Sequence, residues 1–318
     1  LSFERRPFKI EYPEAETATV EGATVFYLPD RELPLVDLTL LVRAGAVDME
    51  GDKIGLAGLI NETLILGGTK KYSPSELALV LDENAIRLSV SVRDEDTVIR
   101  LSVIKDDWHK GLVLLEEILK QPMFDPDALD VAKEQALVEL KRQGGNAQAV
   151  VMREGMIWHF KGHPYGRDPL AGLMTIPLVS REDLKQFLRD YFVPSNMVAA
   201  IAGDIDREDV KAGLSQFFKA LPQTRAPQRN LSDPAETPPV LALIHKPGQV
   251  QSQIALSLPS VKRTHPDYWK ASLLMNVFGG SDSLMYKRLR DDLGLVYSAG
   301  FYQTYKWQAG QLVGYIGC

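Results

Sequence analysis

Residues 54–68 read Ile54-Gly55-Leu56-Ala57-Gly58-Leu59-Ile60-Asn61-Glu62-Thr63-Leu64-Ile65-Leu66-Gly67-Gly68. This run is rich in apolar residues and predicts a helix over 54–66. The pair Gly67-Gly68 predicts the end of that helix, because glycine readily adopts the left-handed conformation that terminates helices.

β-Strands are predicted on both sides of this helix. Residues 23–43 contain two β-rich runs joined by a turn at Pro29-Asp30. Residues 85–102 alternate apolar and polar side chains on either side of Asp94-Glu95-Asp96, which predicts an antiparallel hairpin. The run 197–202 predicts a further short buried strand.

Five further helices are predicted from apolar residues spaced three and four apart. They fall near 106–120, 127–143, 146–160, 180–192 and 206–218. Ser180 precedes the acidic residues Glu182 and Asp183, as is typical of a helix N-terminus. His159 and His163 are four apart, but Gly162 and Pro164 indicate that the helix ends between them, so we do not expect a metal site there.

The opening pattern of the chain returns after a proline-rich stretch. Residues 222–239 hold five prolines and almost no large apolar side chain, so they predict an interdomain linker. The run 242–247 then repeats the first strand, 25–29, and is followed by a second strand and a helix. That helix closes on Gly279-Gly280, as the first closes on two glycines. A coincidence of strand, turn, strand and helix is the alternative interpretation.

This repeat predicts two related domains. The N-terminal domain covers 1–222, the linker covers 223–239, and a partial C-terminal domain covers 240–318. The predicted last strand, 311–317, would leave an apolar edge uncovered, so we expect the second domain to be incomplete. The fold class is α+β, with a mostly antiparallel sheet packed with helices in each domain.

Composition narrows the range of partners. The chain of 318 residues has a net charge of −6 and is 45% hydrophobic. It shows no basic face for nucleic acid and no apolar run near the roughly 18 residues that span a membrane. Its one cysteine, Cys318, permits no internal disulfide. The chain begins at Leu1 without a Met, and we favour removal of a signal peptide, with a periplasmic or cell-envelope location, over trimming and the cytoplasm.

Several short segments together resemble the pitrilysin/insulinase family of zinc peptidases, in particular its processing-peptidase-like members. They are Gly55-Leu56-Ala57, His163-Pro164-Tyr165-Gly166-Arg167, Tyr191-Phe192-Val193-Pro194-Ser195-Asn196-Met197, Gly203-Asp204, Lys246-Pro247-Gly248-Gln249, Gly279-Gly280-Ser281 and the run 289–297. The resemblance covers nearly the whole chain, and the order and spacing of these segments support it. The resemblance implies the same two-domain α+β fold.

The resemblance also indicates which residues are missing. In the family the first helix carries G-L-A-H-x-x-E-H, the inverted zinc motif. Gly58, Asn61 and Glu62 stand where the first histidine, the catalytic glutamate and the second histidine would be. Glu139 falls about where the family places its third zinc ligand, although a solvated helix residue is an equally open interpretation. Glycine has no ligand atom and asparagine is no base, so we expect no zinc and no other cofactor in this chain.

A second set of family residues is intact. Arg290 and Tyr297 stand where the family keeps an arginine and a tyrosine that bind the carbonyl oxygen of the scissile peptide bond. We expect Arg290 at the end of a helix that begins near Ser283, Gly294 after it, and Tyr297 at the start of the next strand. An arginine and a tyrosine suit a developing oxyanion. The alternative is a surface ion pair for Arg290 and a core position for Tyr297.

The resemblance implies a partner. In two-subunit members, one chain carries the zinc motif and the other the arginine and tyrosine. This chain resembles the second kind, as in bacterial two-subunit enzymes and the α-subunit of mitochondrial processing peptidase. We therefore expect a non-catalytic subunit that encloses a peptide substrate beside a zinc-bearing homologous subunit. A structural or peptide-binding scaffold without a role in catalysis, like the core subunits of respiratory complexes, is the alternative.

Overall fold

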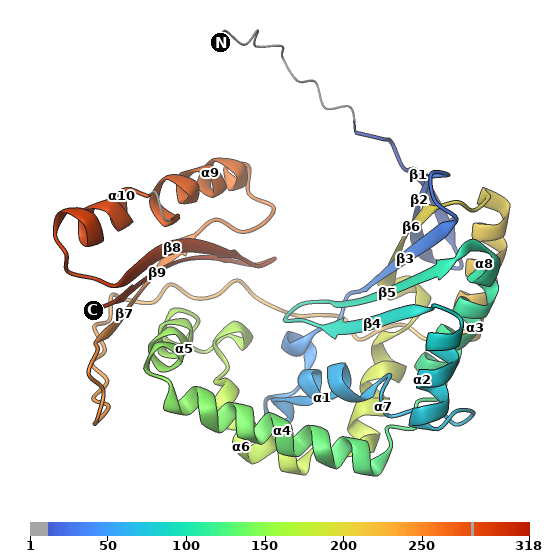
Figure 1. Cartoon of the computed structure of the whole chain (residues 1–318), viewed down its shortest axis with the longest axis horizontal. Helices are drawn as coiled ribbons and strands as arrows, with labels where there is room; N and C mark the ends of the chain where they lie inside the picture. Colours follow the sequence, from blue (N-terminus) through green and yellow to red (C-terminus); the bar gives the residue numbers. More distant parts are fainter. Residues whose placement is uncertain (1–11, 281–282) are drawn as a thin grey trace, which may run out of the picture.

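The computed structural model describes residues 12–280 and 283–318, which form two sheets with helices packed around them (Figure 1). The first eleven residues of the predicted N-terminal domain, and Ser281 of the predicted glycine turn, lie outside the described residues. The larger sheet has the strand order β1-β2-β6-β3-β5-β4 and the smaller one β7-β9-β8. This arrangement confirms the predicted α+β class.

The larger sheet is antiparallel except where β2 runs parallel to β6. Its strands are β1 Glu16–Val20, β2 Ala23–Pro29, β3 Leu35–Val42, β4 Arg87–Val92, β5 Thr97–Ile104 and β6 Met197–Gly203. Side chains alternate between two faces, as in any strand. The predicted hairpin of β4 and β5 and the predicted strands β2, β3 and β6 are confirmed.

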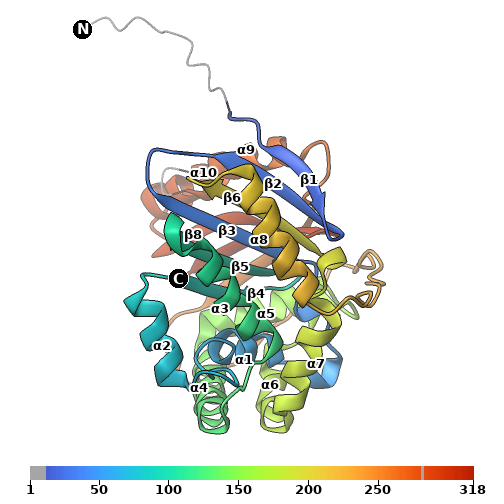
Figure 2. The same cartoon turned by 90° about the vertical axis from the view of Figure 1, so that its right-hand side faces the viewer.

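One face of the larger sheet forms the main hydrophobic core. Leu38 and Leu40 of β3 are fully buried there, against side chains such as Trp108 and Phe217 from the covering helices. Figure 2 looks onto this side, where α3 and α8 lie over the strands. The opposite face carries polar side chains such as Asp37, Thr39 and Arg100, and it is turned toward the second domain in Figure 1.

The predicted helices are confirmed with small changes of boundary. The helices of the first domain are α1 Leu56–Thr63, α2 Pro74–Glu83, α3 Trp108–Lys120, α4 Pro126–Gly145, α5 Ala147–His159, α6 Gly172–Thr175, α7 Arg181–Tyr191 and α8 Arg207–Ala220. Ser180 caps α7, since its hydroxyl accepts from the backbone N–H of Asp183 while the Asp183 carboxylate accepts from the N–H of Ser180. Helix α5 ends at His159, before His163, as predicted.

The smaller sheet repeats part of the larger one. Its strands are β7 Gln253–Ser260, β8 Ser298–Tyr305 and β9 Gly310–Gly317. The order β7-β9-β8 matches β3-β5-β4, with antiparallel pairing throughout. Helix α9, Tyr268–Gly279, follows β7 as α1 follows β3, and α10, Leu284–Tyr286, leads into a π-helical turn, Lys287–Asp292. This correspondence supports a true internal repeat over a coincidence.

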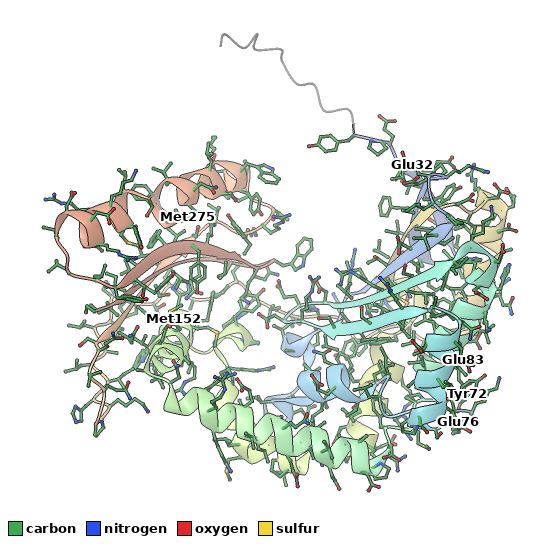
Figure 3. All side chains as sticks on the ribbon, viewed as in Figure 1. Glu32, Tyr72, Glu76, Glu83, Met152 and Met275 are labelled. Atoms are coloured by element: carbon green, nitrogen blue, oxygen red, sulfur yellow. The ribbon has the colours of Figure 1, made fainter. Side chains whose placement is uncertain are left out.

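The small sheet also contacts the first domain. Helix α5 packs against its face, where a β-carbon added at Gly155 would lie 3.9 Å from the side chains of Ala255 and Ser257. Figure 3 places Met152 of α5 beside this sheet and Met275 on α9, across the sheet from α5. A cavity of about 320 Å³ between α5 and the sheet is lined by Met152 and Met156 among others.

One predicted strand is wrong. Residues 242–247 form no strand, and Leu243 is 97% exposed. In the first domain, the equivalent β2 is hydrogen-bonded between β1 and β6. The second copy reaches only the equivalent of β5, so among the described residues no counterpart of β6 borders 242–247. A strand without a neighbour has no ladder to stabilise it.

The proline-rich segment 223–239 has no helix or strand, but the first domain holds it in place. Arg229 donates from Nε to Asp48 at 2.8 Å, and its guanidinium also reaches the carbonyl of Glu95. His163 Nε2 lies 3.0 Å from the carbonyl oxygen of Ser232. The segment is therefore anchored along its length. In the part of the chain that the structure describes, no helix has both the length and the apolar character to cross a bilayer.

Candidate functional site

The helix that would carry a zinc motif is present, but its ligands are not. Gly55 allows α1 to begin, because its φ is +99° and a β-carbon there would lie 2.3 Å from the side chain of Ile176. Gly58 is exposed on α1, and an added β-carbon would meet nothing within 4 Å. Glu62 is exposed on the same helix. A side chain could thus begin at position 58 without a clash at its β-carbon, but glycine supplies no ligand atom.

Asn61 has a structural role. Its Nδ2 donates to the carbonyl oxygen of Val92 at 3.2 Å, and its Oδ1 accepts from the N–H of Val92 at 2.6 Å. Val92 lies on β4, the edge strand of the larger sheet. An amide can both donate and accept, whereas an ionised glutamate can only accept. The residue at the position of the catalytic base therefore ties α1 to the sheet edge.

Glu139 on α4 is held by its own helix. Its carboxylate accepts from Nε and Nη2 of Arg142, both at 2.7 Å, and from Nε2 of Gln143 at 2.9 Å. These hydrogen bonds lower the pKa of Glu139 to about 2. Within residues 12–280 and 283–318, no three histidine, cysteine, aspartate or glutamate side chains gather closely enough to hold a metal ion. The side chains that remain at the motif do not fit a catalytic zinc ion.

Arg290 and Tyr297 lie side by side in the second domain. The guanidinium carbon of Arg290 is 5.7 Å from the centre of the Tyr297 ring. The Tyr297 side chain is 76% exposed, so the alternative in which it occupies the core is wrong. The described residues also provide no ion pair of that alternative, since none of their acidic side chains lies within 4.0 Å of Arg290.

The backbone brings these two side chains together. Arg290 lies in the π-helical turn, and the N–H of Gly294 donates to its carbonyl at 3.0 Å. Gly294 then reverses the chain with φ at +61°. The N–H of Tyr297 donates to the carbonyl of Gly317 on β9 at 3.0 Å, which fixes Tyr297 just before β8. The predicted order of helix end, glycine and strand start is confirmed.

A third residue of this cluster was missed in the sequence. The Tyr286 hydroxyl accepts a hydrogen bond from Arg290, and its ring centre is 5.1 Å from the guanidinium carbon. Tyr286 precedes Arg290 by four residues, which is the spacing of neighbours on a helix face. Arg290 is thus flanked by two aromatic rings.

The structure keeps the two sets of predicted residues apart. Gly58, Asn61 and Glu62 lie on α1, and Glu139 lies on α4 of the first domain. Arg290 lies in the turn Lys287–Asp292, which follows α10 of the second domain, and Figure 1 shows α10 on the side of that domain away from α1 and α4. Each set must therefore act by itself or with residues of another chain.

A two-domain α+β fold whose motif helix lacks zinc ligands defines a peptidase-like protein rather than a self-sufficient zinc peptidase. Two family models match the chain, insulinase (peptidase family M16) over residues 25–170 and the peptidase M16 inactive domain over 178–318. The chain belongs to the M16 family, which confirms the predicted resemblance. Because Gly58 and Asn61 replace the essential motif residues, this chain is a non-catalytic member.

Curated relatives include a non-peptidase homologue and a processing-peptidase subunit. A non-peptidase homologue, YmxG, of Helicobacter pylori is 26% identical over 297 residues, which is 92% of this chain and 67% of that protein. A probable mitochondrial-processing peptidase subunit beta of Schizosaccharomyces pombe is 25% identical over 278 residues, covering 86% of this chain and 60% of that protein. The chain therefore spans about three fifths to two thirds of the length of these relatives.

Solved structures share the fold. A crystal structure of the peptidase M16 inactive domain from Pseudomonas fluorescens superposes with a TM-score of 0.87 at 26% identity, covering 96% of this chain and 74% of that one. A protease from Helicobacter pylori superposes with a TM-score of 0.81 at 18% identity, covering 96% and 75%. The second likeness shows the fold alone.

Proposed function

We propose that this chain is the non-catalytic subunit of a heterodimeric zinc peptidase. Its partner would be a homologous subunit that carries an intact H-x-x-E-H motif. This chain would help to enclose a peptide substrate and would supply Arg290 and Tyr297 to the partner's active site. The zinc motif of this chain does not fit a metal, so the proposal assigns it no zinc chemistry.

The observation that carries this proposal is the exposed pairing of Arg290 with Tyr297. A tyrosine that is 76% exposed contributes little to packing, yet its backbone is fixed by the hydrogen bond to Gly317. The guanidinium and the phenol group lie on one small region of surface. The fold thus holds a cation and a hydroxyl donor side by side at the surface, and neither side chain is buried in a core.

These two groups have a clear chemical use. A guanidinium remains charged at any working pH, and a phenol O–H donates a short hydrogen bond. Both can bind the carbonyl oxygen of a peptide and strengthen their hydrogen bonds as negative charge develops on it. The Tyr286 ring packs beside the guanidinium carbon and limits the orientations open to Arg290.

A scaffold without a catalytic role is the second candidate. It is favoured by the Helicobacter pylori relative, which is described as a non-peptidase homologue. Asn61 supports it as well, because the position of the catalytic base now serves packing between α1 and β4. A scaffold gives no reason for Arg290 and Tyr297 to stand together at the surface.

The deciding experiment mixes the full-length protein with the H-x-x-E-H homologue of the same organism and follows cleavage of a quenched fluorescent peptide. We expect activity only in the mixture, and a loss of about tenfold to a thousandfold for Arg290→Ala or Tyr297→Phe, the range for a lost oxyanion donor. Arg288→Ala serves as the matched control, since Arg288 pairs with Asp292 on the same helical turn.

Two outcomes would contradict the proposal. A mixture that stays inactive, although the two proteins bind each other, would favour the scaffold. So would full activity of both variants. Binding of the two proteins should be measured separately by analytical ultracentrifugation, so that lost assembly is not mistaken for lost catalysis.

A further inference from the structure

The open face of the larger sheet carries a cluster of polar side chains that has no part in the core. On β3, β4 and β5 the side chains opposite α3 and α8 alternate with the buried ones. They surround a hollow of about 380 Å³. The polar side chains that line it are Asp37, Thr39, Arg87, Ser89, Arg100 and Ser102.

The register of the strands places the two arginines close together. Arg87 is opposite Ser102, and Ser89 is opposite Arg100, so the arginines are diagonal neighbours on adjacent strands. Diagonal neighbours on one face of a sheet are about 7–8 Å apart. Both arginines are exposed. Two guanidinium groups can therefore reach ligands that lie on the same face.

Neither Arg87 nor Arg100 forms a salt bridge with an acidic side chain among the described residues. Lys105 pairs with Asp204 at 2.8 Å elsewhere on this domain, whereas no acidic group among the described residues lies within 4.0 Å of Arg87 or Arg100. Asp37 is the one acidic side chain that lines the hollow. With two cations and one anion, the hollow has a net charge of about +1 on a protein whose total is −6.

We propose that this hollow binds the carboxylate side chains of an acidic peptide. An arginine binds a carboxylate through two parallel hydrogen bonds. Ser89, Ser102 and Thr39 add hydroxyl donors between the arginines. Asp37 and the low net charge oppose a densely charged polyanion, since nucleic acids bind through many phosphate contacts. Only the choice of a peptide over another carboxylate ligand rests on the proposed function.

The spacing of the arginines adds a sequence preference. Alternate side chains of an extended peptide lie on one side and repeat about every 6.6–6.8 Å. This repeat is close to the separation of Arg87 and Arg100. Two acidic residues separated by one residue should therefore bind better than two adjacent acidic residues of the same total charge.

The test measures binding to the full chain alone, by fluorescence anisotropy at low salt. The probes are five-residue amidated peptides with a neutral fluorophore. One has two glutamates separated by one alanine, a second has the glutamates adjacent, and a third has glutamines in their place. We expect the first to bind several-fold more tightly than the second, and the third not to bind.

Matched variants assign the binding to the hollow. Arg87→Gln with Arg100→Gln should weaken the first peptide at least tenfold. Lys211→Gln with Arg225→Gln makes the same change of net charge at exposed positions outside the sheet and should leave affinity unchanged. Asp37→Asn should tighten binding a few-fold, because it removes a like charge. Thermal unfolding of each variant confirms that it is folded.

Each adverse result has a distinct meaning. Equal weakening by both double variants would show general charge attraction and overturn the proposal. So would tighter binding of an oligothymidylate than of the acidic peptide. An active heterodimer with no binding of acidic peptides would refute the hollow and leave the proposed function standing. Binding of the acidic peptide by the hollow, with no peptidase activity in any mixture, would support the hollow and refute the proposed function.

Discussion

Asn61 and Val92 exchange two hydrogen bonds, one from the side-chain amide to the carbonyl oxygen at 3.2 Å and one from the backbone N–H to Oδ1 at 2.6 Å. The contact joins α1 to the last strand of the sheet, whose outer backbone groups have no neighbouring strand in the described residues. The amide thus satisfies both backbone groups of Val92.

Replacing Asn61 by leucine should destabilise the protein. Leucine has a similar size but leaves the N–H and the carbonyl of Val92 without these partners, at a cost of about 1–3 kcal/mol. Asn61→Asp keeps the acceptor and loses the donor, so its loss should be intermediate. Urea unfolding measures both variants. Stability of Asn61→Leu equal to wild type would show that these bonds contribute nothing.

Gly58 should be replaceable with a gain in stability. It lies within α1, it is exposed, and an added β-carbon would meet nothing within 4 Å. Alanine reduces the backbone entropy lost on helix formation, which is worth about 0.5–1 kcal/mol. Gly55→Ala is the contrasting control. It should destabilise the fold, because Gly55 has φ at +99° and an added β-carbon would lie 2.3 Å from Ile176.

How far the sequence predicts the fold depends on the range of each interaction. Helices α3, α4 and α8 and the hairpin of β4 and β5 follow from local periodicity, and the structure agrees. β6 lies between β2 and β3 in the sheet although it follows β3 by more than 150 residues in the chain, and no local pattern encodes such a distant pairing. The failed strand at 242–247 has the same origin, since a strand also requires a partner.

The candidate site shows the same division. The helix end before Gly294 and the strand start after Tyr297 are local features that the sequence predicts, whereas the pairing of Arg290 with Tyr297 is expected only from the family resemblance. The link between Asn61 and Val92 spans 31 residues and could not be predicted from the motif. Arg87 and Arg100 come together only through the register of two strands.

Glu139 should titrate far below an ordinary glutamate. Hydrogen bonds from Arg142 and Gln143 lower its pKa to about 2, against about 4.3 in model peptides. Because the pKa of Glu139 is lower in the folded state than in the unfolded state, its ionised carboxylate stabilises the protein at pH values above the unfolded-state pKa. This contribution is lost as pH falls from about 4 toward 2. Since the side chain is exposed, the effect on stability should be small.

The pKa itself is the better measurement. A pH titration of the Glu139 side-chain carboxyl by NMR should give a value near 2 in the wild type. Arg142→Gln should move it up toward that of model peptides, whereas Lys141→Gln, the same charge change one residue away, should move it much less. Titration of wild-type Glu139 near pH 4.3 would show that the contact with Arg142 does not persist in solution.

The turn between β4 and β5 meets the turn between β8 and β9, and this contact joins the two domains. The carboxylate of Glu95 accepts hydrogen bonds from the Tyr165 hydroxyl and from the N–H of Trp307, the latter at 3.1 Å to each oxygen. Lys306 pairs with Asp94, and its Nζ lies 5.0 Å from the centre of the Tyr165 ring. Tyr165 is buried at this junction.

Burial is the main cause that raises the pKa of Tyr165 well above its usual range, and the hydrogen bond to the negatively charged Glu95 raises it further. Because the pKa of Tyr165 is higher in the folded state, the protonated hydroxyl contributes fully to stability at pH values below the unfolded-state pKa of about 10. This contribution is lost as pH rises above that pKa. Urea unfolding at pH 8 and at pH 11 should therefore show a loss of stability at the higher pH.

Tyr165→Phe should reduce this loss, because phenylalanine has no proton to release. It should not abolish it, since burial also raises the pKa of Tyr27 and of Tyr191. At pH 8 the same variant should be less stable than wild type by about 1–3 kcal/mol, because the Glu95 carboxylate loses a buried donor. Tyr12→Phe, at a tyrosine that is 79% exposed, should match wild type at both pH values. A Tyr165→Phe profile parallel to that of wild type would show that this hydroxyl is not protected by the domain junction.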